Sequence, residues 1–295
     1  MKQDTKPKQA KPLPSRPRAR KDNALAAHVE VSAPIPVALT VAGSDSGGGA
    51  GIQADLKTFE ALGVFGTVAL TCATAQNPDA VDAVEPLSPD MVARQIRTVC
   101  DGFPVAAAKT GMLYSAEIIE AVAELARERL VPNWVVDPVM IATSGARLLR
   151  EDAIAALCRA LLPHATVLTP NAQEAEVLWE RSIRTEKDLR DAARAIGQRF
   201  GVACVVKGGH LAAQAGPNPV VADALWDGAD LHVFTSPAVS ARETHGTGCT
   251  FSAALAAGLA LGRALPEATR LAQRFVAHAL RNAVPVGRHA PLRWA

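Results

Sequence analysis

Strand-like and helix-like segments alternate along the chain from residue 36 onward, and this alternation constrains the fold more than any other feature. Short runs rich in β-branched residues, Ala and Val predict strands over 36–42, 67–75, 106–111, 134–139, 166–169 and 202–207. Longer segments with amphipathic spacing predict helices over 51–62, 89–101, 115–130, 151–162, 172–180 and 186–200. Such alternation is typical of a mostly parallel central sheet with helices on both faces. The sequence therefore predicts a three-layer α/β fold.

The last third of the chain continues the same domain. Asp227-Gly228 lies between two β-favouring runs and predicts a hairpin. Apolar and amphipathic segments then predict two closing helices, over 247–261 and 266–284. Because no linker-like stretch interrupts these elements, we expect a single domain over residues 35–295.

Residues 1–34 have a different composition from the rest of the chain. Within residues 1–22, eight basic residues stand against two acidic ones, a net charge of +6, which leaves −4 for the remainder of a chain whose total is +2. A segment with so few large apolar side chains cannot offset its ordering entropy, so we expect a disordered basic tail. A nucleic-acid arm is the alternative, but no aromatic residue interleaves the charges for base stacking, which favours a solubilising extension.

The five cysteines are odd in number, scattered, and without a C-x-x-C pair. This pattern predicts neither a zinc site nor a disulfide framework, and it suits a reducing compartment. No run approaches 18 uninterrupted apolar residues, and no apolar core follows the N-terminal charges, so neither a membrane span nor a secretory signal is expected. We therefore expect a cytoplasmic protein with no membrane partner.

Ligands of such sheets bind at the carboxyl ends of the strands, so the residues after each predicted strand are the candidates for a site. The first strand is followed by Gly43-Ser-Asp-Ser-Gly-Gly-Gly-Ala-Gly51, whose glycines permit close backbone approach ahead of an anion-favouring helix N-terminus. This turn lacks the Gly-Lys-Ser/Thr of a P-loop, and no acid ends the second strand, which weakens the dinucleotide interpretation. Asp55 and Gln76 present a carboxylate and an amide suited to a heterocycle. An ordinary turn, a helix-dipole Asp and a turn-bonded Gln are the alternatives.

Polar residues also follow the later strands. Asp137 ends the fourth strand, where its carboxylate can approach a magnesium–phosphate group. Asn171 and Glu174 lie three residues apart after the fifth strand, a spacing that suits both a phosphate site and a capping box. Lys207 follows the sixth strand and precedes two glycines, so it can reach a phosphate, although a lone lysine is more often solvated.

The most specific motif is Thr244-His-Gly-Thr-Gly-Cys-Thr-Phe251, which leads into an Ala-rich apolar helix. Its two glycines turn successive N–H groups toward one point, which forms a nest for an anion and can stabilise charge on a transferred phosphoryl group. Cys249 lies in the first turn of this helix, where the helix dipole is expected to lower the pKa of its thiol. The alternative is a buried cysteine at the start of a helix of small residues.

Together these motifs resemble the ribokinase-like superfamily and, within it, the hydroxymethylpyrimidine/phosphomethylpyrimidine kinases of thiamine biosynthesis. The matching segments stand in the family's order within about residues 36–285, and they are 42–59, 75–77, 109–113, 137–140, 169–174, 207–210 and 244–250. The resemblance implies transfer of the γ-phosphate of ATP to 4-amino-5-hydroxymethyl-2-methylpyrimidine, followed by a second transfer that makes the diphosphate. ATP and Mg²⁺ would be the cofactors, and a homodimer is expected.

The resemblance also implies a role for each matching residue. The pyrimidine-binding residues would be Gln76, Asp55, Gly43, Met112 and Val139. ATP and its phosphates would be bound by Asn171, Glu174, Lys207 and Thr244, and magnesium by Asp137 and Glu174, partly through water. The groups that act in the transfer itself would be Lys207, an anion hole of Gly246, Thr247 and Gly248, and Cys249, which replaces the aspartate base of most sugar kinases.

Two other functions stay open. The pyridoxal/pyridoxine kinases of the same superfamily share most of these motifs and, in one branch, the cysteine; comparing kcat/KM for the two substrates separates the readings. A weakly catalytic pyrimidine-binding regulator would use the basic tail on nucleic acid, but the complete Gly-Thr-Gly-Cys turn speaks against it. Residues 286–295 depart from the family's Gly- and His-rich ending, and residues 1–35 lie outside the resemblance.

Overall fold

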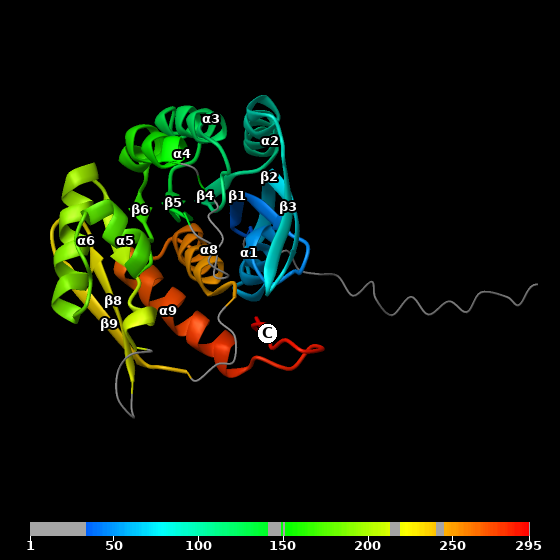
Figure 1. Ribbon diagram of the computed structural model, residues 1–295. Helices are drawn as coiled ribbons and strands as arrows, with labels where there is room; N and C mark the ends of the chain where they lie inside the picture. The colour runs from blue at the N-terminus through cyan, green and yellow to red at the C-terminus, as the bar shows by residue number, and fades with distance from the viewer. Residues whose placement is uncertain (1–33, 141–148, 150, 213–218, 240–244, 295) are drawn as a thin grey trace, which may run out of the picture. The chain divides into compact units, whose positions relative to one another are not determined.

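A nine-stranded sheet forms the centre of the described part of the chain, in the order β3-β2-β1-β4-β5-β6-β7-β8-β9 (Figure 1). Six of its strands are parallel: β1 (Val37–Asp45), β2 (Phe65–Asn77), β4 (Val105–Thr110), β5 (Trp134–Val136), β6 (Val167–Leu168) and β7 (Ala203–Val206). Antiparallel strands extend both edges: β3 (Ala80–Pro86) beside β2, and the hairpin of β8 (Val220–Trp226) and β9 (Leu231–Pro237) beside β7. The carboxyl ends of the six parallel strands therefore meet at one edge of the sheet.

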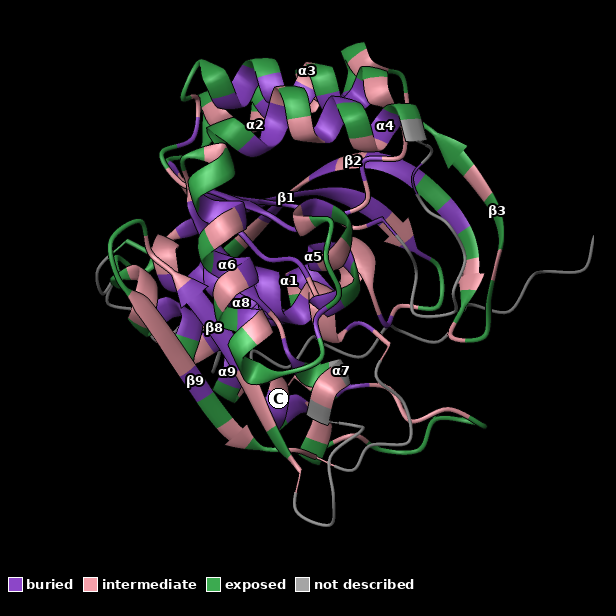
Figure 2. Cartoon of the chain, turned by 60° about the vertical axis from the view of Figure 1, so that its left-hand side comes forward, coloured by how far each residue is buried: buried purple, intermediate pink, exposed green. Residues whose placement is uncertain are grey.

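Helices cover both faces of this sheet, which confirms the three-layer prediction. One face carries α1 (Gly51–Ala61), α8 (Thr247–Ala260) and α9 (Leu265–Arg281). The opposite face carries α2 (Pro89–Gly102), α3 (Ala116–Arg127), α4 (Glu151–Ala156), α5 (Ala172–Trp179) and α6 (Glu186–Phe200). Figure 2 shows the buried residues along the sheet and on the helix sides that face it, with the exposed residues outside. Two apolar cores, one for each face, thus hold the strands in place.

The computed structural model describes residues 34–140, 149, 151–212, 219–239 and 245–294. Residues 35–295 form one compact unit. The expected disordered tail falls almost entirely on residues 1–33, outside the described residues, and stays a prediction. In the described ranges, the longest helices are too short or too polar to cross a membrane.

The predicted elements agree with the observed ones along most of the domain, including all six parallel strands and the hairpin around Asp227-Gly228. The helix predicted over 151–162 differs, because α4 gives way to a π-helical turn (Leu157–Leu161) and a 3-10 turn (Leu162–His164). Pro163 has no backbone N–H to donate, which favours the end of regular α-helical bonding there. Strand β3 and the short helix α7 (Gly209–Ala212) were not predicted.

Helix α1 buries a different face from the one its apolar residues predict. Ile52, Leu56 and Phe59 recur at helical spacing, yet only Phe59 is buried and the other two are half-buried. The side of the helix that is fully buried also carries Asp55 and Thr58. A buried carboxylate needs a partner, and this one has a lysine from β4, described below.

Candidate active site

The glycine-rich turn after β1 is organised by Asp45. Its carboxylate accepts backbone N–H groups from Gly47 at 2.8 Å, Gly49 at 3.1 Å and Ala50 at 2.8 Å. The turn closes at Gly51, whose φ of +56° lies in the left-handed region and whose missing Cβ would overlap the carbonyl oxygen of Gly43. The spacing of the glycines therefore produces one defined turn at the N-terminus of α1.

The second glycine-rich turn, at the start of α8, lies directly against the first. Gly246 has a φ of +84°, and a Cβ there would overlap the carbonyl oxygen of Gly49. His245 Nε2 lies 3.0 Å from Asp45 Oδ2, which joins the two turns through their side chains. Burial raises the pKa of Asp45, but the hydrogen bonds from His245, Gly47 and Ala50 outweigh it, so the net pKa lies below the usual value. Asp45 is therefore a carboxylate at neutral pH.

Helix α8 begins at this contact without a side-chain cap on its first N–H groups. A Cβ on Gly248 would lie 3.6 Å from Lys207 Nζ and 3.9 Å from Asp137 Oδ2. The structure thus places Lys207 close to Gly248, in the turn predicted to form the anion hole, and the binding of an anion there stays a prediction. Thr247 lies between the two glycines in the same turn, whereas Thr244 lies outside the described residues.

Lys207 and Asp137 form an ion pair at the carboxyl ends of β7 and β5. Lys207 Nζ lies 3.1 Å from Asp137 Oδ1, with 13% of the lysine side chain and 3% of the aspartate side chain exposed. Asp137 also accepts hydrogen bonds from Thr169 Oγ1 at 3.2 Å and Ser252 Oγ at 3.1 Å. Burial lowers the pKa of Lys207, but Asp137 and Glu174 raise it by more, so the lysine is cationic. A positive charge thus lies beside the start of α8.

Asn171 and Glu174 form the capping box of α5, so this structural interpretation of their spacing is confirmed. Asn171 Oδ1 accepts the N–H of Glu174 at 2.9 Å, and Glu174 Oε2 accepts the N–H of Asn171 at 2.9 Å. Burial raises the pKa of Glu174 to about 7, because Lys207 offsets the desolvation only in part. A nearby divalent cation would favour the ionised form of this carboxyl.

The donor set suits Mg²⁺ held between protein and phosphate better than a cage made by protein alone. The described residues contain no group of three or more His, Cys, Asp and Glu side chains arranged for a metal. Asp137 and Glu174 are two carboxylates close enough for the charge of one to affect the pKa of the other. Mg²⁺ commonly uses one or two carboxylates, several waters and the substrate phosphates. The residues therefore fit a magnesium–nucleotide complex, and their role as ligands stays a prediction.

Three of the residues predicted to bind the pyrimidine, Gln76, Gly43 and Met112, lie in or beside the first glycine-rich turn. The N–H of Gln76 donates to Ser46 Oγ at 2.7 Å, and its side-chain Oε1 accepts from Thr74 Oγ1 at 3.1 Å. A Cβ on Gly43 would lie 3.8 Å from Met112 Sδ, which brings these two predicted wall residues together. Val139 follows the strand that holds Asp137 and is half-buried. Contact of any of them with a pyrimidine stays a prediction.

Asp55, the fifth of these residues, is sealed in the interior. Its carboxylate accepts Lys109 Nζ at 2.9 and 3.0 Å and Thr40 Oγ1 at 2.6 Å, and neither charged side chain is exposed to solvent. Burial lowers the pKa of Lys109, but Asp55 raises it by more, so the lysine stays charged. A ligand can reach Asp55 directly only by displacing these partners. Asp55 is therefore better placed to act on the site indirectly, through Lys109.

The expectation that the pKa of the Cys249 thiol is lowered is wrong, because the pKa is raised. Burial raises the pKa of the thiol to about 11, while the charge of Lys109 and a hydrogen bond from the N–H of Gly51 lower it only in part. Desolvation of the thiolate thus outweighs the interactions that lower its pKa. The side chain is a neutral thiol at physiological pH.

Several residues of this site were not predicted from the sequence, namely Asp45, Lys109, His245 and Ser252. Lys109 lies within the segment 109–113 that carries the family resemblance, but its role is visible only once β4 is placed opposite α1. His245 adjoins the glycines of the most specific motif, which is the one signal that pointed to it. The contact of Asp45 with His245 joins residues 200 positions apart.

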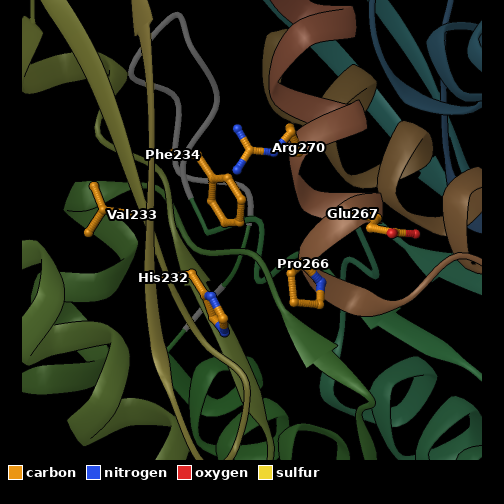
Figure 3. Close-up of a pocket in the computed structure, with 6 residues that line it drawn as sticks. All are labelled: His232, Val233, Phe234, Pro266, Glu267 and Arg270. Atoms are coloured by element: carbon orange, nitrogen blue, oxygen red, sulfur yellow. The ribbon is translucent and has the colours of Figure 1, made fainter.

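A surface cavity of about 260 Å³ lies elsewhere, between the edge strand β9 and helix α9 (Figure 3). It is lined by His232, Val233, Phe234, Pro266, Glu267 and Arg270. The guanidinium of Arg270 lies 5.0 Å from the centre of the Phe234 ring. None of the predicted site residues lines this cavity, so it is separate from the candidate site.

Comparison with known proteins reveals relatives over most of the chain. The thiamine biosynthesis bifunctional protein ThiED of Geobacter sulfurreducens is 47% identical over 86% of this chain, which spans only 51% of that longer protein. The hydroxymethylpyrimidine/phosphomethylpyrimidine kinase of Synechococcus elongatus is 46% identical, over 86% of this chain and 94% of its own length. Among solved structures, the ADP complex of Bacillus subtilis pyridoxal kinase has a TM-score of 0.78 and 38% identity, and covers 88% of this chain and 97% of its own.

The family model described as phosphomethylpyrimidine kinase matches residues 45–293. That range includes the second glycine-rich turn, the first one from Asp45 onward, both lysine–carboxylate pairs and the capping box, so the match covers nearly all of the arrangement described above. The structural similarity to the pyridoxal kinase agrees with the ribokinase-like α/β fold inferred from the motifs. The chain therefore belongs to the phosphomethylpyrimidine kinase family.

Proposed function

We propose that this protein phosphorylates 4-amino-5-hydroxymethyl-2-methylpyrimidine with ATP, and then phosphorylates the resulting monophosphate to the diphosphate. In the first step the hydroxymethyl oxygen attacks the γ-phosphorus, the bond to ADP breaks, and the hydroxyl proton is released. In the second step a phosphate oxygen of the monophosphate attacks the γ-phosphorus of another ATP, and the bond to a second ADP breaks. Relatives at 46–47% identity are named for these kinase activities and for thiamine biosynthesis, which supports the proposal.

One observation carries the proposal: the uncapped start of α8 adjoins the cationic Lys207 at the ends of β5 and β7. Peptide N–H groups at a helix N-terminus and a lysine ammonium both stabilise negative charge on a phosphoryl group. Phosphoryl transfer through a loose transition state depends mainly on positioning and on neutralising charge. Asp137 and Glu174 would hold Mg²⁺, partly through water, and the ion would supply positive charge to the phosphates of ATP.

For the pyrimidine, we propose recognition by the amide of Gln76, with Gly43, Met112 and Val139 as neighbouring walls. An amide can both donate to a ring nitrogen and accept from an exocyclic amine. The sequence predicts direct contact by Asp55 as well. Because its carboxylate is sealed by Lys109 and Thr40, we propose that Asp55 supports the site by fixing Lys109 beneath it.

Cys249 has a modest part in this proposal. A thiol with a pKa of about 11 is a poor proton acceptor at neutral pH. The loose transition state requires little removal of the hydroxyl proton before the phosphorus–oxygen bond forms. Positioning of the hydroxymethyl group by the first turn of α8 would therefore contribute more than proton transfer.

Phosphorylation of pyridoxal is the second candidate, favoured by the likeness to the Bacillus subtilis pyridoxal kinase. The matching family model is described as phosphomethylpyrimidine kinase, and relatives at 46–47% identity are named for the pyrimidine pathway. These names support the pyrimidine as the principal substrate. The regulator interpretation has less support, because the chain retains Lys207 and the complete second glycine turn.

A product assay tests the proposal. The purified protein is incubated with ATP, Mg²⁺ and the hydroxymethylpyrimidine, and mono- and diphosphate are separated by chromatography. We expect both products in sequence, and a higher kcat/KM for the pyrimidine than for pyridoxal. Absence of phosphorylated pyrimidine would overturn the proposal, and a higher kcat/KM for pyridoxal would replace it with the second candidate. A cytoplasmic homodimer stays our prediction for location and assembly.

A further inference from the structure

Residues 286–294 return from the end of α9 to the candidate site, and the family match extends as far as residue 293 of this segment. A turn is closed by hydrogen bonds between the backbones of Val286 and His289, at 2.8 and 3.1 Å. Leu292 is then buried, with 4% of its surface exposed, and the N–H of Arg293 donates to the carbonyl of Ala279 in α9 at 3.2 Å. Figure 1 shows this red segment close to α1. The segment is therefore packed against the domain rather than trailing from it.

Trp294 contacts α1 and α8, the helices that follow the first and the second glycine-rich turn. Its indole Nε1–H donates to Thr250 Oγ1 at 3.1 Å, and Thr250 is a fully buried residue in the first turn of α8. The ammonium of Lys57 in α1 lies 4.7 Å from the centre of the indole ring, and the same ammonium donates to the carbonyl oxygen of Gly48 at 2.7 Å. A single indole thus connects the start of α8 to the first glycine-rich turn.

The other end of the segment contacts the turn between β2 and β3. Arg288 forms an ion pair with Asp79, and His289 Nε2 lies 3.7 Å from the same carboxylate. Asp79 lies three residues after Gln76, the proposed reader of the pyrimidine. The segment therefore bridges three parts of the site. Exposed ion pairs contribute little free energy, so the contacts of Trp294 carry most of the connection.

The connection matters because the two turns have to keep a fixed separation. In the proposed reaction, the first turn lies on the pyrimidine side and the start of α8 holds the transferred phosphoryl group. A misplacement of about 1 Å between reacting groups can cost about 100-fold in rate. The cation–ring contact restrains the Lys57 ammonium that holds Gly48, and the indole N–H restrains Thr250.

We propose that Trp294 is a positioning residue for phosphoryl transfer, acting through Thr250 on the start of α8 and through Lys57 on the first glycine-rich turn. This inference rests on the proposed kinase function. Trp294 acts by holding other groups, and the ligand-binding atoms belong to the turns themselves. Its loss is expected to reduce kcat more than it raises KM for the pyrimidine, because alignment counts most in the transition state.

The test uses the full chain with Trp294→Phe, which keeps a ring for Lys57 but removes the hydrogen bond, and Trp294→Ala, which removes both contacts. Lys57→Met removes the same connection from the other side. Trp179→Phe is the matched control, because Trp179 is also half-buried and pairs with a cation, Arg181, at 5.5 Å. We expect kcat to fall about 5-fold for Trp294→Phe and about 30-fold for Trp294→Ala, with KM changing less than about 3-fold.

Two further measurements separate positioning from general stability. The double variant Trp294→Ala/Lys57→Met should lose little more activity than the worse single variant, because both residues act in one chain of contacts. Amide hydrogen exchange should become faster in residues 43–51 and 246–250 of Trp294→Phe, while the strands of the sheet keep their protection. Trp179→Phe should change neither.

Each result either supports or overturns the positioning role of Trp294. Wild-type kcat and unchanged exchange in Trp294→Phe would overturn the inference, as would a loss of protection spread over the whole domain. If Trp294→Ala does not fold, Trp294→Phe and Lys57→Met decide alone. If the wild-type protein makes no phosphorylated pyrimidine, the proposed function fails, and the exchange experiment still determines whether Trp294 holds the two turns.

Discussion

Two lysine–carboxylate pairs lie near the first turn of α8, and they differ mainly in their access to solvent. In the pair of Lys109 and Asp55, neither side chain is exposed, and the lysine contacts both carboxylate oxygens. In the pair of Lys207 and Asp137, 13% and 3% of the side chains are exposed, and the lysine contacts one oxygen at 3.1 Å. The first pair is closed to solvent, whereas in our proposal Lys207 of the second pair exchanges a contact with the protein for one with a phosphate.

The two lysine–carboxylate pairs therefore have different roles, although their chemical groups are the same. A sealed ion pair contributes by fixing elements in place, and removing one partner leaves an uncompensated charge in the interior. A lysine at the edge of the interior keeps its charge and can still meet a ligand, and Lys207 has such a position beside Gly248. We therefore expect changes in the first pair to affect folding and changes in the second to affect catalysis.

The largest effect is expected from Lys109→Met. Removing the lysine leaves the Asp55 carboxylate buried without a counter-charge, which should lower the free energy of unfolding by about 3–5 kcal/mol. Urea unfolding followed by circular dichroism measures the change. The double variant Lys109→Met/Asp55→Leu should recover much of the loss, because an apolar pair can replace a buried ion pair. Equal free energies of unfolding for Lys109→Met and wild type would contradict a structural role for this pair.

The next largest effect is expected from Lys207→Ala. Loss of a cation that stabilises transferred charge should lower kcat/KM by about 100- to 1,000-fold, while the fold is retained. Steady-state kinetics measures the loss of kcat/KM, and thermal melting checks that the fold is retained. Lys187→Ala is the control, because that lysine forms an exposed pair with Asp191 in α6 and should leave the rate unchanged. A catalytic loss explained entirely by unfolding would contradict the distinction between the two pairs.

A smaller effect is expected from Cys249→Ala. Because its thiol is protonated at neutral pH, removing it should lower kcat about 10-fold or less without unfolding the protein. A kcat equal to that of wild type would remove any role of Cys249 in the transfer, and a loss far above 10-fold would restore its assignment as the base.

The pKa of Cys249 has its own signature in thiol chemistry. With a pKa of about 11, the thiolate fraction rises about tenfold for each pH unit between pH 7 and pH 10. The rate of alkylation by iodoacetamide, followed at the Cys249 peptide by mass spectrometry, should rise in proportion. A rate that levels off near pH 7 would instead support the dipole-lowered pKa that the motif suggested.

The smallest effect is expected at Asp45, which joins the two glycine-rich turns. Its folded-state pKa lies below the ordinary value of 3.8, so its stabilisation is complete above that pH and is lost as the pH falls through the lower folded value. Asp45→Asn should lower the free energy of unfolding by about 1–2 kcal/mol at pH 7, and the difference should shrink below pH 4. A difference that grows on acidification would contradict the hydrogen-bonding pattern around this carboxylate.

Much of the fold could be predicted because its strands and helices differ in length and in the spacing of apolar residues. Strand β3 escaped prediction because it lies at an edge, with mostly exposed residues and no apolar run. The buried face of α1 escaped because it contains Asp55 and Thr58, which a hydrophobic pattern assigns to the surface.

The site was predictable where one segment carries its geometry, as in the glycine-rich turns and the capping box of α5. It was less predictable where residues distant in sequence meet. Lys109 and Asp55 are 54 positions apart, and the local pattern gave no reason to pair them. The position of Cys249 at a helix N-terminus predicts a lowered pKa, but burial by the surrounding chain raises the pKa instead.

A crystal structure with a non-hydrolysable ATP analogue, Mg²⁺ and the hydroxymethylpyrimidine tests the difference between the two pairs most directly. We predict that Lys207 Nζ contacts a phosphate oxygen at the N–H groups of Gly246–Gly248. Lys109 should remain within hydrogen-bonding distance of Asp55, as in the 2.9 Å contact described here. A phosphate bound away from Lys207, or a pyrimidine bonded to Asp55 with Lys109 displaced, would contradict the account.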